Sequence, residues 1–139
     1  MAHRNPSDDQ LRQLLSGAST IAMIGASSNP AKPSHGIMRS LQRAGYRVIP
    51  VNPRETEILG ERAYPSLLDI PEPVDIVDVF RRPEDTPSIA DEAITKGAKA
   101  LWLQEGIVNE EAAARASAAG LTVVMNACIS ATRRRVLGR

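Results

Sequence analysis

The stretch Ala44-Gly45-Tyr46-Arg47-Val48-Ile49-Pro50-Val51 joins the end of a predicted helix, a glycine and a short apolar strand. The same order returns at residues 96–103 and 119–125, where Gly97 and Gly120 hold the glycine position. A glycine just after a helix takes a positive φ without a Cβ penalty, which makes it a common helix C-cap. Recurring units of helix, glycine and strand predict an alternating α/β chain.

Apolar spacing separates the predicted helices from the predicted strands. Ile37, Met38, Leu41 and Ala44 recur at helical spacing between residues 34 and 44. A second helix is predicted from about 83 to 96, and Asn109 is a plausible N-cap for a third. The strands are predicted at residues 21–24, 47–51, 75–80, 99–103 and 121–125, with a short edge strand within 60–64.

Continuous apolar strands indicate a parallel sheet covered on both faces. With right-handed crossovers this predicts one doubly wound, mostly parallel, Rossmann-like α/β sheet. We expect a single domain over residues 1–139, with its core at about 11–128 and a basic, solvated C-terminal tail at 129–139.

Composition excludes several classes of function. The 139 residues suit one core, and a net charge of +1 with 3% aromatic residues favours neither duplex nor single-stranded nucleic acid as a partner. The apolar runs are strand-sized, so no membrane span is predicted. Cys128 is the only cysteine, which excludes an intrachain disulfide. The N-terminus has no signal-peptide pattern, and we predict a cytoplasmic location.

A ligand in such a sheet binds at the carboxyl ends of the strands, where the winding reverses. If strand 21–24 is central, this rule selects the loop 25–36 and the segment 80–84. Gly25 would let backbone approach a phosphate, and Ser27, Ser28 and the following helix N-terminus offer donors. Two alternatives stay open: the turn itself could require Gly25, and Lys32, Arg81 and Arg82 could be solvated surface charges.

The loop lacks the Gly-x-Gly-x-x-Gly pattern of a NAD site, since Gly25 and Gly36 are too far apart. A NAD site also places an acid at the end of the second strand, where this chain has Asn52-Pro53-Arg54. A neutral or basic segment suits a phosphorylated ribose better. Coenzyme A and NADP both carry such a phosphate, so this feature alone does not separate them.

Longer phrases make the chain similar to a known family. They are Ile24-Gly25-Ala26-Ser27, Lys32-Pro33-Ser34-His35, GYRVIPVNP at 45–53, GERAYPSL at 60–67, VDIVDVFRRP at 74–83 and WLQEGI at 102–107. Over about residues 11–128 the chain resembles the small bacterial CoA-binding proteins related to the N-terminal domain of the succinyl-CoA synthetase α subunit. The resemblance implies coenzyme A as the ligand.

The resemblance also implies site residues. Gly25, Ala26, Ser27 and Ser28 would hold the pyrophosphate, and the matching phrase Lys32, Pro33, Ser34 and His35 would complete that loop. Asn52, Pro53 and Arg54 would face the adenosine and its 3′-phosphate. The adenine-side wall would come from Phe80, Arg81 and Arg82, and the turn of Gln104, Glu105 and Gly106 would close the pocket. One departure is Asn126, where the family favours an Asp.

No catalytic or metal-binding constellation is found. His35 has no carboxylate partner and either caps a helix or contacts a phosphate, and no ligand spacing favours a metal. Cys128 could form a mixed disulfide with the coenzyme thiol, although a small, partly buried hydrophobe is the simpler interpretation. Succinyl-CoA synthetase uses a phosphorylated histidine on a second domain and a separate nucleotide-grasping subunit, and we expect 139 residues to be too few for either.

The leading hypothesis is therefore a CoA or acyl-CoA binding protein without chemistry of its own, acting as a carrier, sensor or regulator. The alternatives are an NADP-type oxidoreductase domain and an interaction subunit of a larger acyl-CoA enzyme. The partners left open are a second copy of the chain, as a homodimer, and such a larger enzyme.

Overall fold

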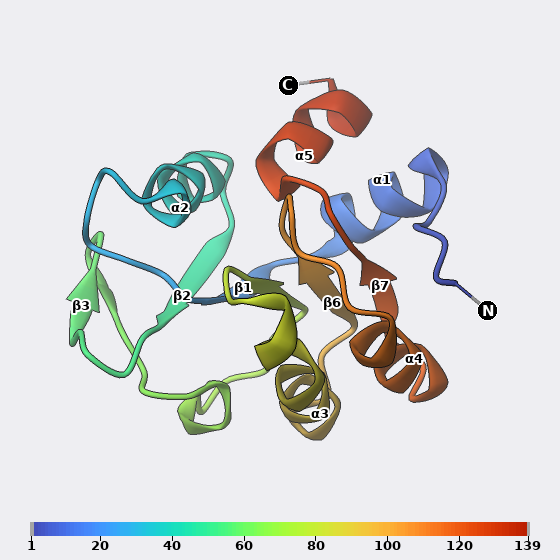
Figure 1. Cartoon of the computed structure of the whole chain (residues 1–139). Coiled ribbons are helices and arrows are strands. Elements are labelled where there is room, and N and C mark those ends of the chain that lie inside the picture. The colour runs from blue at the N-terminus through green and yellow to red at the C-terminus, as the bar shows by residue number, and fades with distance from the viewer. Residues whose placement is uncertain (1, 139) are drawn as a thin grey trace.

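The apolar strands form one parallel sheet in the computed structural model, which describes residues 2–138 (Figure 1). Its strands are β1 (Thr20–Ile24), β2 (Arg47–Val51), β5 (Ile76–Val79), β6 (Ala100–Leu103) and β7 (Thr122–Val124). Their order is β2-β1-β5-β6-β7, and every neighbouring pair is parallel. All of β5 and β6 is buried, which confirms the predicted sheet with two covered faces.

Helices cover both faces of this sheet (Figure 1). One face packs against α1 (Asp8–Gly17), α2 (Pro33–Arg43) and α5 (Ile129–Leu137), through a cluster that includes Met23 and Trp102. The other packs against α3 (Thr86–Lys96) and α4 (Glu110–Ala118), through a cluster that includes Val77 and Leu101. Alternate residues of each strand enter opposite clusters, as the pleat requires.

Local sequence signals set the helix boundaries. Ser7 begins α1 with a capping box, in which its side chain accepts from the Gln10 N–H and the Gln10 side chain accepts from the Ser7 N–H. The Asn109 side chain accepts from the Ala112 N–H and so caps α4, as predicted. Gly45, Gly97 and Gly120 all take positive φ after their helices, which confirms the repeated unit.

Two predicted segments differ in detail. Part of 60–64 enters a separate hairpin, β3 (Glu57–Ile58) with β4 (Glu61–Arg62), and Tyr64 forms an isolated parallel bridge to Val51 of the main sheet. The prediction that the core ends near residue 128 is wrong. Ile129 and Val136 of α5 are buried in the cluster beneath α1, so this segment is part of the core as well as basic.

The winding reverses between β1 and β5, as predicted. The chain leaves β1 through α2 on one face, and it leaves β5 through a short 3-10 turn, η2 (Pro83–Asp85), into α3 on the opposite face. Loops that diverge from adjacent strand ends leave a crevice between them. The carboxyl ends of β1, β2 and β5 therefore surround the candidate site.

Candidate functional site

Gly25 is the turn at the end of β1, and the protein itself requires it. Its φ is +87°, and a Cβ at this position would lie 2.3 Å from the Phe80 carbonyl oxygen at the end of β5. The Gly25 N–H donates to the Val51 carbonyl of β2 at 3.1 Å. The turn is thus packed against the ends of both neighbouring strands. Of the alternatives that the sequence left open, the turn itself therefore requires Gly25.

The rest of the loop satisfies many of its own polar groups. The Asn29 N–H donates to Ser27 Oγ at 3.0 Å, and the Ala31 N–H donates to Asn29 Oδ1 at 2.9 Å. The N–H groups of Ala26 and Ser27 take no part in these bonds. The loop then enters α2, whose N-cap residue Lys32 makes no side-chain capping bond. At the start of α2 the Lys32 N–H donates to the Asn29 carbonyl and the His35 N–H donates to the Lys32 carbonyl. The candidate donors for an anion are therefore the Ala26 and Ser27 N–H groups at the start of the loop, for which no hydrogen bond is found within residues 2–138.

Two clefts meet at this turn. The first, which we call the β2 cleft, has a volume of about 440 Å³ and includes the end of β2, the segment 65–67, and Ile89 and Glu92 of α3. The second, the loop cleft, has a volume of about 470 Å³ and is lined by residues of the β1 loop with Phe80 and Ile107. Gly25, Asn52 and Arg81 line both. The two clefts offer an extended ligand one path across Gly25, and each has the size of a small-molecule site.

Asn52 joins the β1 loop to the loop after β2. Its Nδ2 donates to the Ala26 carbonyl at 2.8 Å, and its Oδ1 accepts from the Arg54 N–H at 2.8 Å. A residue that the sequence reasoning missed lies beside it: Glu55 Oε2 accepts from the Ser28 N–H at 3.0 Å and from Asn52 Nδ2 at 3.4 Å. Hydrogen bonds from the Ser28 side chain and then its backbone hold the Glu55 pKa below its usual range.

The two arginines after β5 differ in position. Arg81 lines both clefts, and its Nη2 lies 3.2 Å from Asp85 Oδ2. Arg82 lines neither cleft; its side chain is 73% exposed and lies 3.4 Å from the same carboxylate oxygen. Of the pair, only Arg81 is placed to meet a ligand in the crevice.

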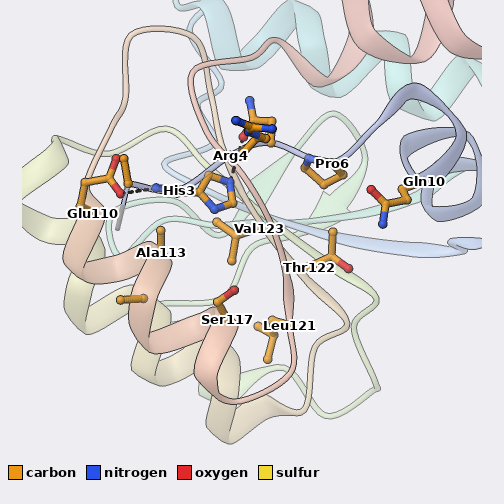
Figure 2. A pocket seen from close by; sticks show the side chains of 13 residues that line it. His3, Arg4, Pro6, Gln10, Glu110, Ala113, Ser117, Leu121, Thr122 and Val123 are labelled. Carbon is orange, nitrogen blue, oxygen red and sulfur yellow. Dashed lines mark hydrogen bonds between the residues drawn. The ribbon is translucent and has the colours of Figure 1, made fainter.

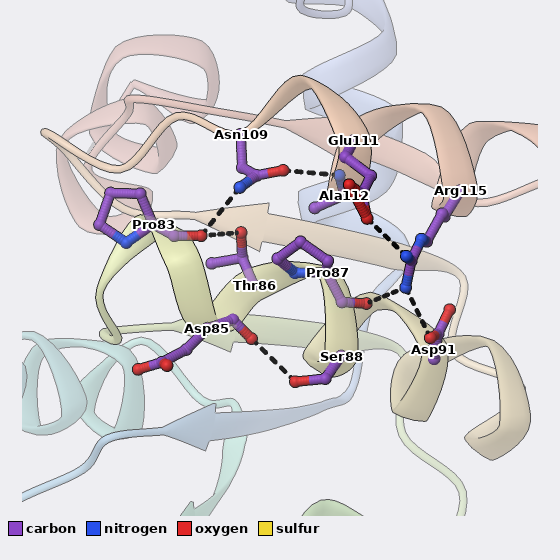
Figure 3. A network of polar contacts seen from close by, with 10 residues as sticks. All are labelled: Pro83, Asp85, Thr86, Pro87, Ser88, Asp91, Asn109, Glu111, Ala112 and Arg115. Carbon is purple, nitrogen blue, oxygen red and sulfur yellow. Dashed lines mark hydrogen bonds and ion pairs between the residues drawn. The ribbon is translucent and has the colours of Figure 1, made fainter.

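A polar network anchors this segment to α4 (Figure 3). The Pro83 carbonyl accepts from Thr86 Oγ1 at 2.6 Å and from Asn109 Nδ2 at 3.0 Å. Further out, Arg115 of α4 donates to Asp91 of α3 at 2.8 Å (Figure 3). The start of α3 is thereby fixed against α4, which holds the preceding Arg81 at the crevice.

The turn after β6 is built differently from its predicted role. Gln104 is buried, lines neither cleft, and its Nε2 donates to Asp78 Oδ1 at 2.5 Å. Asp78 is fully buried within β5, and burial raises its pKa to about 7, against the opposing effect of the Gln104 hydrogen bond. Glu105 and Gly106 are exposed and outside both clefts. Ile107, one residue further, lines the loop cleft instead.

The predicted site residues fall into two groups, those that line a cleft and those that do not. Those that line at least one cleft are Gly25, Ala26, Ser27, Lys32, Pro33, Ser34, Asn52, Pro53, Arg54, Phe80 and Arg81. His35 is half-buried in α2, and Ser28 faces Glu55; neither lines a cleft. The β2 cleft also contains Pro65, Ser66 and Leu67, which nothing in the sequence argument linked to strand ends.

A larger hollow of about 580 Å³ lies elsewhere, between the N-terminal segment, α4 and β7 (Figure 2). There the His3 N–H donates to Glu110 Oε1 at 2.7 Å. It lies along the edge of the sheet and away from the winding reversal, so its size does not make it the candidate site. Within residues 2–138 there is no cluster of three metal-binding side chains, and no helix has the length and apolar character to cross a membrane.

Comparison with known proteins bears on this crevice. The family model for the CoA binding domain matches residues 19–134, from β1 into α5. The chain belongs to the CoA-binding domain family. This match includes every residue that lines the two clefts.

Relatives of this CoA-binding domain occur both as short chains and within larger enzymes. The uncharacterized protein YneT of Bacillus subtilis is 43% identical over 126 residues, which cover 91% of this chain and 93% of YneT. A hypothetical protein of Pyrococcus horikoshii has a solved structure with a TM-score of 0.93 and 39% identity, covering 99% of each chain. The ADP-forming acetate–CoA ligase II of Archaeoglobus fulgidus is 34% identical over 94 residues, covering 66% of this chain and 14% of the ligase.

Proposed function

We propose that this chain binds coenzyme A or an acyl-CoA across Gly25 and carries out no reaction of its own. The observation that carries the proposal is the meeting of the two clefts at Gly25, Asn52 and Arg81. Membership of the CoA-binding domain family supports coenzyme A over NADP as the ligand.

The shape of the crevice supports an orientation for the ligand. The β2 cleft contains the end of the second strand, which faces the ribose in Rossmann-like sites, so it is assigned to the adenosine. The pyrophosphate then lies at Gly25, near the Ala26 and Ser27 N–H groups and the α2 N-terminus. The pantetheine arm extends along the loop cleft toward Phe80 and Ile107, whose apolar side chains suit its carbon chain.

The proposed absence of catalysis rests on the groups that line the crevice. A nucleophile needs a base within hydrogen-bond reach, and no such pair lines the clefts within the described residues. A carrier, sensor or regulatory role follows, including one as a module that docks on a larger acyl-CoA enzyme, because relatives of this domain occur within acetate–CoA ligases.

Calorimetry with a pair of matched variants tests the proposal. Arg81→Gln removes a charge from both clefts, whereas Arg82→Gln removes one beside the same Asp85 but outside them. We expect Arg81→Gln to weaken CoA binding about 10-fold or more, as for a lost charge-assisted bond to phosphate. We expect Arg82→Gln to change it less than about threefold.

Both variants should unfold at the same temperature as the original chain within about 2 °C, since each removes an exposed ion pair. Binding of NADPH in preference to CoA would contradict the proposal, as would equal losses in the two variants. Native mass spectrometry of the purified chain would report bound CoA and the number of copies together.

A further inference from the structure

Glu55 occupies donors that a phosphate at this site would use. Its Oε2 lies 3.0 Å from the Ser28 backbone nitrogen and 3.4 Å from Asn52 Nδ2. Ser28 belongs to the loop after β1, and Asn52 lines both clefts. A carboxylate with two or more donors imitates one edge of a phosphate, because both present negatively charged oxygens to the same N–H groups.

The carboxylate is charged at neutral pH. Hydrogen bonds from Ser28, side chain first and backbone second, hold the Glu55 pKa below its usual range, while burial opposes them. Among the described residues, no cation forms an ion pair with Glu55. The neighbouring Arg54 donates its backbone N–H to Asn52 Oδ1. A negative charge therefore stands beside the crevice, where it accepts hydrogen bonds from Ser28 and Asn52.

We propose that Glu55 is an internal competitor of the ligand's phosphate groups, and that its displacement from Ser28 sets the affinity of the site. This inference rests on the proposed function. A phosphate bound at the loop either takes the Ser28 N–H from Glu55 or lies close to its charge, and both lower the affinity. Glu55 lies in the loop between β2 and β3, so it can swing outward without disturbing the main sheet.

The sign of the effect separates competition from ligand recognition. If Glu55 held a ribose hydroxyl, as the acid of a NAD site does, its loss would weaken binding. If Glu55 is a competitor, its loss strengthens binding of the ligand. Glu55→Gln keeps a side-chain oxygen that accepts from Ser28 but removes the charge, so the loop geometry is retained.

Calorimetry with CoA is the first test, with Glu57→Gln as the control. Glu57 is an exposed acid two residues away, and its side chain forms no hydrogen bond or ion pair within residues 2–138. Both variants therefore change the net charge equally. We expect Glu55→Gln to bind CoA about threefold to tenfold more tightly, and Glu57→Gln to change the affinity by less than about twofold. If Glu55→Gln gains affinity for CoA and dephospho-CoA alike, the pyrophosphate is the group that competes with Glu55. If it gains affinity for CoA alone, the 3′-phosphate is that group.

A second measurement keeps this inference separate from the proposed function. The backbone amide of Ser28 is followed by NMR during titration with inorganic pyrophosphate. We expect its resonance to shift at several-fold lower pyrophosphate concentration in Glu55→Gln than in the original chain. If neither Glu55→Gln nor the original chain binds CoA but the two still differ in their response to pyrophosphate, the competitor role of Glu55 is supported and CoA is not the ligand. Weaker or unchanged binding of both CoA and pyrophosphate in Glu55→Gln would overturn the competitor.

Discussion

The strand ends on either side of β5 carry similar polar residues but use them differently. After β6, Gln104 bonds Asp78, and the Gly106 N–H donates to Asn126 Oδ1 at 2.7 Å, so the turn closes on the protein. After β1, the Ala26 and Ser27 N–H groups lie outside the loop's internal bonds, and both residues line the loop cleft together with Arg81 from the end of β5. The difference shows that a polar strand end becomes a candidate site when the winding leaves its groups open to a ligand.

The largest effect is expected at Gly25, in the open region. Gly25→Ala places a Cβ 2.3 Å from the Phe80 carbonyl oxygen, at a φ of +87°. We expect a loss of about 3–5 kcal/mol in the free energy of unfolding, because two strand ends must move apart. Urea unfolding measures this loss.

Gly36 is the matched control, because a Cβ there meets no atom within 4 Å and the residue lies inside α2. Gly36→Ala should be neutral or stabilise by about 0.5–1 kcal/mol. Equal stability of the two variants would show that Gly25 is kept for the ligand and that the strand ends tolerate a side chain.

A smaller effect is expected in the closed region, at Asp78. Burial raises its pKa from the ordinary 3.8 to about 7, so between these values the folded chain holds a proton that the unfolded chain has lost. Stability from this group is therefore present at acidic pH and falls as the pH rises through about 7. The free energy of unfolding of Asp78→Asn relative to the original chain should increase by about 2–3 kcal/mol between pH 5 and pH 8.

Other titrating groups, including Glu92 with its pKa raised by burial, are common to both proteins and cancel in this difference. Because Asp78 lines neither cleft, its replacement should leave CoA affinity unchanged within about twofold at pH 6, where both side chains are uncharged. If the difference in free energy of unfolding between Asp78→Asn and the original chain does not change between pH 5 and pH 8, the Asp78 carboxylate is charged and stabilised within the sheet.

The sheet and the site of winding reversal were predictable from the sequence because they depend on local signals, whereas many of the residues that line the clefts were implied by the family resemblance. Apolar runs identify strands, Gly45, Gly97 and Gly120 mark helix ends, and parallel strands bring their carboxyl ends together. The pairing of Glu55 with Ser28 was not predictable in this way, since it depends on how two loops of different strands fold back. The sequence also did not predict which of Arg81 and Arg82 lines the clefts, because the backbone conformation of the turn sets the direction of each side chain.

The most direct test of the account is an NMR titration of the chain with CoA, in which backbone amides report the place of binding. The account predicts that shifts concentrate at Ala26, Ser27, Asn52, Phe80 and Arg81, around the two clefts. It predicts little change at the closed turn of Gly106 and Asn126, or at the hollow around His3 and Glu110 (Figure 2). Saturable shifts centred on either of those regions, with the β1 loop unchanged, would contradict it.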